Sequence, residues 1–483
     1  MAKWLGAGLA ALLAACTVGP DYHRPDAPSA AQWRPEPPWQ PGAPQDARAK
    51  GPWWQVFGDA KLNQFEETAL AQNQTLQVAT ARLDQARALV RVDAAALYPQ
   101  VAVGVTADRA KTSADRPLLS TVPNISTVQN DVVPAFSVRY EADLFGGVRR
   151  QVEGARASAE QARADLENAR LVLTSEVAAD YFSLRELDVE IDVIDQGIRL
   201  QRRALDFITA RHELGDASGL DLAQQQALLD STTTQIDLLR NQRGQYEHAL
   251  AALLGTPAPS FTIEPKVIEL IVPSVPLDLP SDVLQRRPDV ASSERAMAAA
   301  NAQIGVARAA FFPSIPFFAN YGRESNRVAD LFTAPSTLWS FGLSATQTLF
   351  DAGLRAGNLD FARAGYAASV ATYRQTVLTA FQEVEDGLVG LGTLARASAE
   401  ASAAVHSAQR VLDLANDRYA GGVATYLDVI TAQQALLTNQ RLEAQIRGQQ
   451  MVTAVFLVKA LGGGWSAGGA PSEAPGSTVG LLR

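Results

Sequence analysis

Cysteine and histidine are both scarce in this chain of 483 residues, which contains one cysteine, Cys16, and four histidines. A single cysteine cannot form a disulfide within the chain, and the histidines lack metal-ligand spacing. Serines and carboxylates are plentiful, but they are scattered along predicted helices without a compact cluster for catalysis. The glycine run 462–464 lacks the Lys-Ser/Thr that follows a phosphate-binding loop. These absences argue against an enzyme and against a metal or nucleotide cofactor.

An excess of basic residues is also missing, because 42 Lys and Arg stand against 51 Asp and Glu and give a net charge of −9. A nucleic-acid surface needs a basic stripe, so this balance argues against one. The N-terminal apolar run, residues 4–15, is too short to cross a membrane as a helix. With Lys3 ahead of it, the run is typical of a signal peptide that covers residues 1–15.

Cys16 stands at the end of that run, directly after Leu13-Ala14-Ala15. These residues resemble the bacterial lipobox, which is cleaved ahead of a cysteine that then carries lipid, palmitate among its acyl chains. The alternative is an incidental buried thiol near a secretory signal. Thr17 stands where lipoproteins kept at the inner membrane usually have Asp, so the resemblance indicates the outer membrane. Residues 16–60, rich in proline, are predicted to form a lipid-anchored tether.

Residues 147–213 carry the dominant pattern of the chain, a seam of apolar and small side chains at steps of three and four. A single helix of about 65 residues would rise roughly 100 Å, at about 1.5 Å per residue, which no compact domain can enclose. The pattern therefore predicts long helices packed side by side, and a free-standing coiled coil is the alternative. The seam consists of Val148, Val152, Ala155, Ala159, Ala162, Leu166, Ala169 and Leu173, followed by Val177, Leu184, Leu187, Ile191, Ile194, Ile198, Leu205 and Ile208.

Ahead of this helix, the period of the pattern changes. Helical spacing runs from about residue 61 to Leu97, and Pro99 ends it. Apolar residues then alternate with polar ones, which predicts a β-hairpin over about residues 100–145. Each strand is about 9 to 11 residues, the length that crosses a bilayer when tilted. A soluble hairpin packed on a domain is the alternative.

The second half of the chain repeats the first. Ala96-Leu97-Tyr98-Pro99 matches Ala310-Phe311-Phe312-Pro313 at an offset of 214, and Leu144-Phe145 matches Leu349-Phe350 at 205. At the helix ends, Gly215 matches Gly422 at 207. The predicted parts are repeat 1 over 61–255, with its hairpin at about 100–145 and helices 147–213 and 218–254; a linker over 256–281; repeat 2 over 282–462, with its hairpin at about 314–350 and helices 353–420 and 425–461; and a flexible tail over 463–483.

The predicted strands cannot form a closed sheet within one chain. Lipid offers no hydrogen-bond partners, so membrane-exposed sheet edges are excluded and several chains must share one barrel. Two, three or four chains would give 8, 12 or 16 strands. Twelve helical columns at about 8 to 10 Å spacing would leave an aqueous tunnel, which favours a trimer over a tight dimer.

Several segments together resemble the TolC-like outer-membrane factors, and specifically the efflux lipoproteins of the OprM/NodT type. The resemblance covers nearly the whole mature chain in order. Its segments are Cys16-Thr17-Val18-Gly19-Pro20-Asp21-Tyr22, Tyr140-Glu141-Ala142-Asp143-Leu144-Phe145-Gly146 with Arg149-Arg150, Arg286-Arg287-Pro288-Asp289-Val290 with Glu294, Ile304-Gly305 to Phe311-Phe312-Pro313-Ser314, and Tyr419 through Gly422 to Tyr426-Leu427-Asp428-Val429.

The resemblance implies a mainly α-helical chain with membrane hairpins that forms a homotrimer. Its 12-stranded β-barrel in the outer membrane would continue into a periplasmic 12-helix α-barrel. The implied partners are a periplasmic adaptor and an inner-membrane pump of the RND type, which supplies the energy. The expected function is therefore a passive exit duct for drugs or other small solutes, with no cofactor apart from the lipid on Cys16. A periplasmic coiled-coil adaptor or scaffold lipoprotein without its own pore is the alternative.

In this family the helix-to-helix turns close the periplasmic end. The resemblance places adaptor contacts at the turns marked by Gly215 and Gly422, with Tyr419 beside the second. It places entrance carboxylates at Asp221 and Asp428, where three copies would favour cations. Ordinary capping of a helix start is the alternative for both acids. The chain differs from better-known members in having Ala424 and Thr431 where some have charged gate residues.

Overall fold

A computed structural model describes residues 17–26, 51–111, 128–273 and 286–463. They fall into two compact units, each built from three stretches of the chain. Unit 1 combines Met1–Asp26, Arg82–Arg163 and Ser292–Tyr373, and unit 2 combines Ala27–Ala81, Ala164–Ala291 and Arg374–Arg483.

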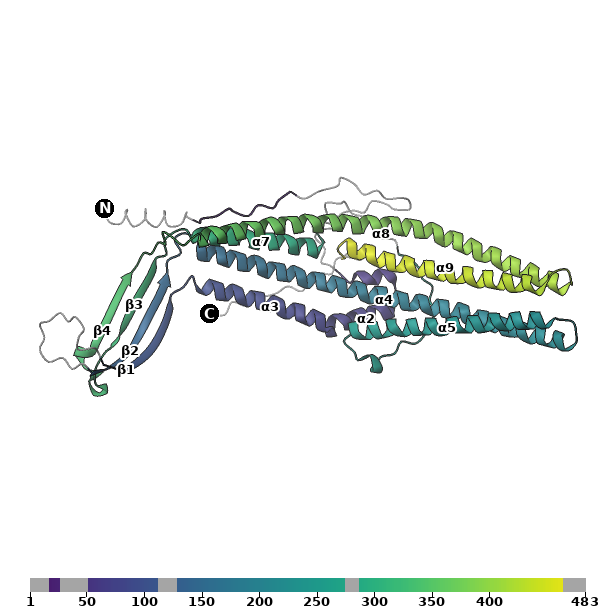
Figure 1. The fold of residues 1–483 in the computed structure, drawn as a ribbon, viewed down its shortest axis with the longest axis horizontal. Helices are drawn as coiled ribbons and strands as arrows, with labels where there is room; N and C mark the ends of the chain where they lie inside the picture. The colour runs from purple at the N-terminus through teal and green to yellow at the C-terminus, as the bar shows by residue number, and fades with distance from the viewer. Residues whose placement is uncertain (1–16, 27–50, 112–127, 274–285, 464–483) are drawn as a thin grey trace. The chain divides into compact units, whose positions relative to one another are not determined.

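The order of elements follows the sequence repeat (Figure 1). The two long helices, α4 and α8, have 67 residues each, and the two helices that follow them, α5 and α9, have 35 each. Repeat 1 contains α2 (Ala60–Gln72), α3 (Gln74–Ala95), β1 (Gln100–Lys111), β2 (Val128–Glu141), α4 (Gly147–Glu213) and α5 (Gly219–Leu253). Repeat 2 contains α7 (Pro288–Ala309), β3 (Pro316–Arg323), β4 (Thr337–Leu343), α8 (Leu354–Ala420) and α9 (Tyr426–Ala460).

Unit 1 contains a four-stranded antiparallel sheet in the order β1-β2-β3-β4. The two hairpins are therefore joined by the pairing of β2 with β3, in which Tyr140 lies opposite Phe317. Strands β1 and β4 form the edges of the sheet. Their lengths differ from the predicted 9 to 11 residues, since β1 and β2 have 12 and 14 residues and β3 and β4 have 8 and 7.

The first helical segment is interrupted at Asn73, which the periodicity of the sequence does not indicate. The Asn73 backbone is extended, and its side-chain oxygen accepts a hydrogen bond from the Leu76 N–H at 2.9 Å, which caps α3. Its Nδ2 donates to the carbonyl of Leu253 at 2.9 Å, at the end of α5. The break therefore separates α2 from α3 and brings the start of α3 to the end of α5.

The start of α7 meets the end of α9 in the corresponding way. Arg287 is 6% exposed, and its guanidinium donates to the Ala460 carbonyl at 3.0 Å. It also forms ion pairs with Asp289 at 2.7 Å and with Glu383 of α8 at 2.6 Å. Arg287 thus serves as a structural joint between three helices, with its charge matched by two carboxylates.

The predicted C-terminal boundary of the tether, residue 60, lies too late in the chain, because part of residues 51–60 is folded. Residues Trp53–Phe57 form a 3-10 helix whose Trp53 and Trp54 are 4% and 7% exposed. The Trp53 indole donates to Thr174 Oγ1 of α4 at 3.1 Å. Two buried indoles supply enough apolar area to fix this segment in the core of unit 2.

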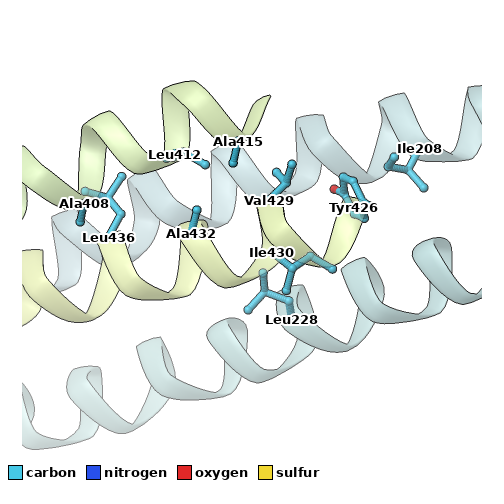
Figure 2. Close-up of a cluster of buried hydrophobic side chains, with 10 residues drawn as sticks. All are labelled: Ile208, Leu228, Ala408, Leu412, Ala415, Tyr426, Val429, Ile430, Ala432 and Leu436. Atoms are coloured by element: carbon cyan, nitrogen blue, oxygen red, sulfur yellow. The ribbon is translucent and has the colours of Figure 1, made fainter. Parts of the chain in front are cut away.

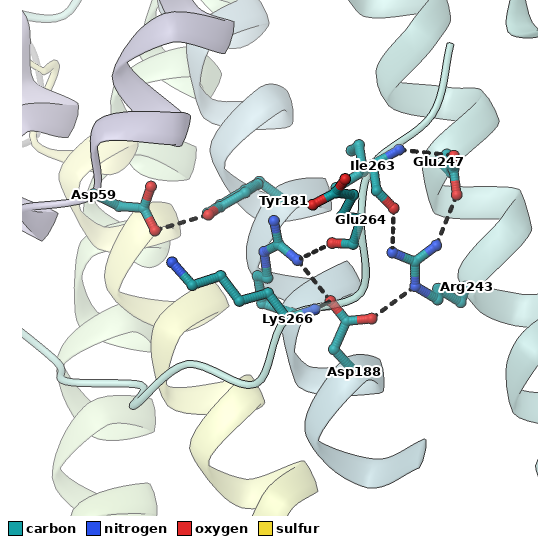
Figure 3. A network of polar contacts seen from close by, with 9 residues as sticks. Asp59, Tyr181, Asp188, Arg243, Glu247, Ile263, Glu264 and Lys266 are labelled. Carbon is teal, nitrogen blue, oxygen red and sulfur yellow. Dashed lines mark hydrogen bonds and ion pairs between the residues drawn. The ribbon is translucent and has the colours of Figure 1, made fainter. Parts of the chain in front are cut away.

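The described part of the predicted linker, 256–273, is also bound rather than free (Figure 3). Arg243 of α5 donates to the Ile263 carbonyl and to Asp188 of α4, both at 2.7 Å. Glu247 accepts the Ile263 N–H at 2.9 Å, and Asp188 accepts the Lys266 N–H at 3.1 Å. Because Asp188 and Arg243 are buried, this network fixes the segment to α4 and α5.

Candidate functional site

One face of the sheet in unit 1 is apolar and exposed. The pairing places Val103, Phe136, Tyr321 and Trp339 in one row across all four strands. Residues directly opposite one another share a face, so this face also holds the other odd-numbered apolar residues of β1 and β4. Their exposed fractions are 70% for Val101, 68% for Val103, 68% for Val105, 59% for Tyr321, 67% for Trp339, 70% for Phe341 and 72% for Leu343.

The opposite face of the same sheet is polar. Its central row holds Ala102, Ser137, Asn320 and Ser340, and Asn320 Nδ2 donates to Ser340 Oγ at 3.2 Å. No described part of the chain covers the apolar face, which contradicts the alternative of a hairpin packed on a soluble domain. An uncovered apolar face behind a polar face is the arrangement of a membrane sheet that borders water.

Among the helices in the described residues, none has an apolar stretch long enough to cross a membrane. Those residues also contain no group of three His, Cys, Asp or Glu side chains that could hold a metal ion. Cys16 lies outside the described residues.

The turns between α4 and α5 and between α8 and α9 belong to unit 2. Gly215 and Gly422 have φ values of +85° and +73°, which favour glycine because the residue lacks a Cβ. In the first turn the Asp216 N–H donates to the Arg211 carbonyl at 2.8 Å, and in the second the Val423 N–H donates to Arg418 at 2.9 Å. The two turns therefore end their long helices in the same way.

Asp221 and Asp428 both take part in capping the helix that follows the turn. Asp221 accepts the Ser218 N–H at 3.1 Å, while Ser218 Oγ accepts the Asp221 N–H at 3.1 Å. Asp428 accepts from the Thr425 N–H at 2.9 Å and from its hydroxyl at 2.8 Å. These hydrogen bonds and the nearby Arg418 charge hold the pKa of Asp428 below its usual value. Both acids therefore make capping hydrogen bonds, and they place negative charge at the turns, where Asp428 is exposed and Asp221 is half-buried.

A buried core joins the two helix pairs near these turns (Figure 2). Tyr426 of α9 lies in it with 4% exposure, and its hydroxyl donates to Gln225 Oε1 of α5 at 2.8 Å. Gln225, which is fully buried, donates in turn to the Gln201 carbonyl of α4 at 2.9 Å. Burial raises the pKa of Tyr426, so its hydroxyl stays protonated. The core consists of Ile208, Leu228, Ala408, Leu412, Ala415, Tyr426, Val429, Ile430, Ala432 and Leu436.

Tyr419 extends this contact toward the end of α8. Its ring centroid lies 5.1 Å from that of Tyr426, and the Arg211 guanidinium lies 5.3 Å from the Tyr419 ring. The residue is half-buried. Arg211, Tyr419, Tyr426 and Gln225 therefore link α4 and α5 to α8 and α9.

A second link lies further along the same helices, beside a cavity of about 570 Å³. Glu190 of α4 is 2% exposed and pairs with Arg441 of α9 at 2.6 Å. Glu186 lies one turn before Glu190 on α4 and packs against Gly448 of α9. A Cβ added at Gly448 would overlap the Glu186 side chain. Burial, followed by the charge and hydrogen bond of Glu190, raises the pKa of Glu186 to about 7.

The structure therefore brings Tyr419 together with residues that sequence reasoning missed, while Asp221 and Asp428 lie at the helix starts. Gln225 and Tyr426 are 201 positions apart, and Glu190 and Arg441 are 251 apart. The Tyr426 motif was the only signal in the sequence that could have indicated this site.

The comparisons with known proteins agree on one family. The family model described as outer membrane efflux protein matches residues 67–256 and 279–463. The probable efflux pump outer membrane protein SepC of Pseudomonas putida is 34% identical over 471 residues, covering 96% of this chain and 97% of SepC. The antibiotic efflux pump outer membrane protein ArpC of Pseudomonas putida is 34% identical over 94% of both chains.

Solved structures show the same fold. The outer-membrane channel OprN matches with a TM-score of 0.85 and 28% identity, covering 93% of this chain and 100% of OprN. The outer membrane channel CmeC of Campylobacter jejuni matches with a TM-score of 0.86 and 26% identity, covering 93% of this chain and 95% of CmeC.

Proposed function

This chain belongs to the outer membrane efflux protein family, and we propose that three copies of it form the exit duct of a tripartite efflux system. The family resemblance in the sequence is thereby confirmed, as is the TolC-like fold. The protein is an outer-membrane efflux channel rather than an enzyme. Its relatives act in efflux pumps, so a periplasmic adaptor and an inner-membrane pump are its partners.

The observation that carries the proposed assembly is the uncovered apolar face of a sheet with two open edges. Four strands cannot close a barrel, whereas three copies supply twelve. The apolar faces then contact lipid and the polar faces line the passage. A periplasmic adaptor without its own pore would expose this apolar row to water. The row of Val103, Phe136, Tyr321 and Trp339 therefore disfavours the adaptor alternative.

The proposed entrance is formed by the turns at Gly215 and Gly422, which the adaptor contacts together with Tyr419. Three copies each of Asp221 and Asp428 around a narrow aperture favour cations and resist anions. The buried hydrogen bond between Tyr426 and Gln225 keeps the two helix pairs together in the closed state. Adaptor binding opens the duct by stabilising the arrangement in which this bond is broken. An RND pump, proposed as the inner-membrane component, supplies the energy.

The proposed lipid anchor on Cys16 fits the docking of the residues that follow it. The Val18 N–H donates to the Phe145 carbonyl at 3.2 Å, and Arg150 pairs with Asp21 at 2.7 Å. Gly146, which Thr17 contacts, lies just beyond β2. A lipid on Cys16 would therefore enter the bilayer beside the start of the sheet.

Planar-bilayer recordings of the purified protein test this function. Asp428→Asn keeps an acceptor oxygen for Thr425 and removes only the charge, so we expect the permeability ratio of cations to anions to fall. Asp230→Asn, an exposed acid on α5 away from the turn, is the matched control. An unchanged ratio in Asp428→Asn would return that residue to capping alone, and protein that forms no pores at all would contradict the duct.

A further inference from the structure

The end of the sheet that lies away from the helices carries basic side chains on its apolar face. Strand β1 begins at Gln100, shortly after α3, and ends at Lys111, so Lys111 marks this far end. Side chains two residues apart share a face of a strand, which puts Arg109 and Lys111 on the face of Val103 and Val105. Both basic side chains are exposed, and neither has an ion-pair or hydrogen-bond partner among the described residues.

Arg323 of β3 adds a third basic side chain to the same face. It lies opposite Thr337 of β4, two residues beyond the pair of Tyr321 and Trp339. Its Nη1 donates to the Thr333 carbonyl at 2.7 Å and to Thr337 Oγ1 at 3.0 Å. Because Thr333 belongs to the connection between β3 and β4, these hydrogen bonds hold the guanidinium at the far end of the sheet.

Charge is sorted between the two faces of the sheet. The acidic residues of the four strands, Asp108, Asp131 and Glu141, all lie on the polar face, where Asp108 is opposite Asp131. Arg139 lies on the polar face as well, whereas the other basic residues of the strands lie on the apolar face. Within the strands, the apolar face therefore carries positive charge alone, which suits a surface of negative charge.

The position of these basic residues matches the edge of a hydrocarbon layer. Tyr140 and Phe317 belong to the row of the apolar face that lies nearest the helices. Asn130, which is opposite Arg109, lies ten residues from Tyr140 along β2. Ten residues span about 33 Å of strand, or about 25 Å of depth at a tilt of about 40°. The apolar band of outer-membrane sheets is also about 25 Å tall, so Arg109 and Lys111 lie where the headgroups begin.

The two ends of the apolar face therefore differ. Toward the helices the face holds aromatic rings, among them Trp339 and Phe341, whose centroids lie 5.8 Å apart. Aromatic side chains suit either interface of a bilayer, whereas clustered Lys and Arg suit an interface with anionic headgroups. The helices of this family extend into the periplasm, so the basic end reaches the outer leaflet.

We propose that Arg109, Lys111 and Arg323 bind the phosphate groups of lipopolysaccharide, the glycolipid of the outer leaflet. Its sugar headgroup carries phosphates above its acyl chains, so one molecule can pack on Val103 and Val105 while its phosphates meet the basic residues. Arg109 and Lys111 stand about 7 Å apart along the strand, close enough to bind one phosphate together. This surface continues the lipid-contacting face and does not depend on how many copies assemble.

Native mass measurements of the full-length protein in detergent, titrated with lipid A, test this surface. Arg109→Gln and Lys111→Gln should each weaken lipid A binding about 5-fold, and the double variant about 30-fold, because each side chain contributes one charge contact. Arg139→Gln, on the polar face of the same sheet, is the matched control and should bind lipid A as the wild type does. Dephosphorylated lipid A tests for contact through the acyl chains alone, and phosphatidylglycerol tests for any anionic lipid.

The outcomes separate this surface from the channel itself. Equal lipid A binding by the wild type and the double variant would overturn the proposal, as would equal binding of dephosphorylated lipid A or an equal loss in Arg139→Gln. Equal binding of phosphatidylglycerol would overturn the assignment to lipopolysaccharide. All variants should keep the wild-type conductance in planar bilayers, so protein that forms no pores would contradict the duct rather than this surface.

Discussion

The hydrogen bond between Tyr426 and Gln225 offers the sharpest test of how the entrance stays closed. Tyr426→Phe removes one hydroxyl from a core in which the two side chains are 4% and 0% exposed, and it leaves the ring in place. The lost bond and the Gln225 oxygen left without its donor together cost about 1–3 kcal/mol. If the bond is made only in the closed state, the ratio of open to closed channels rises about 5- to 150-fold.

The assay is the open probability of single channels in planar bilayers without adaptor. Amide exchange around Gln201 and Gln225 should accelerate in parallel, because both helices lose their buried anchor. Tyr419→Phe is the matched control, since it removes a hydroxyl but keeps the ring that packs on Tyr426 and Arg211. Equal open probability in wild type and Tyr426→Phe would show that this bond does not hold the entrance closed.

Two further predictions concern a buried acid and the N-terminus. The folded-state pKa of Glu186 is raised to about 7, so charging it destabilises the fold progressively from about pH 4.5 to pH 7 and fully above pH 7. Glu186→Gln should therefore raise the free energy of unfolding at pH 8 by on the order of 3 kcal/mol at most, which a higher melting temperature would report, and should have little effect at pH 4. Equal gains in melting temperature at both pH values would refute this. Cys16→Ser should abolish metabolic labelling with palmitate, and a variant that keeps its label would disprove the lipobox interpretation.

Much of the fold could be predicted because its signals are local. The two long helices begin and end within one residue of the predicted limits. Their ends are marked by Gly215 and Gly422, whose positive φ angles few other residues accept. Alternation in β1 and β2 likewise indicates a two-faced sheet before any partner strand is known.

The features that were missed depend on partners far along the chain. The periodicity of α2 and α3 continues across Asn73, and only the Leu253 carbonyl explains why the helix breaks there. Trp53 stands next to a proline-rich segment, yet Thr174 and the core of unit 2 hold it.

The candidate site likewise combines features with local sequence signals and features that depend on residues far along the chain. Asp221 and Asp428 were visible as acids near glycine turns, and their capping could be anticipated from the first turn of a helix. The Glu186 and Glu190 pair looks like any two acids one turn apart on a solvated helix. The raised pKa of Glu186 arises from burial and from Glu190, and the burial depends on packing against Gly448, which comes from the other repeat.

Electron cryo-microscopy of the protein extracted from outer membranes tests the central claim most directly. We expect a particle of three copies in which β4 of each copy forms hydrogen bonds with β1 of the next copy. The polar faces of all twelve strands should surround one open passage. A single copy with both sheet edges unpaired and no passage would contradict the account.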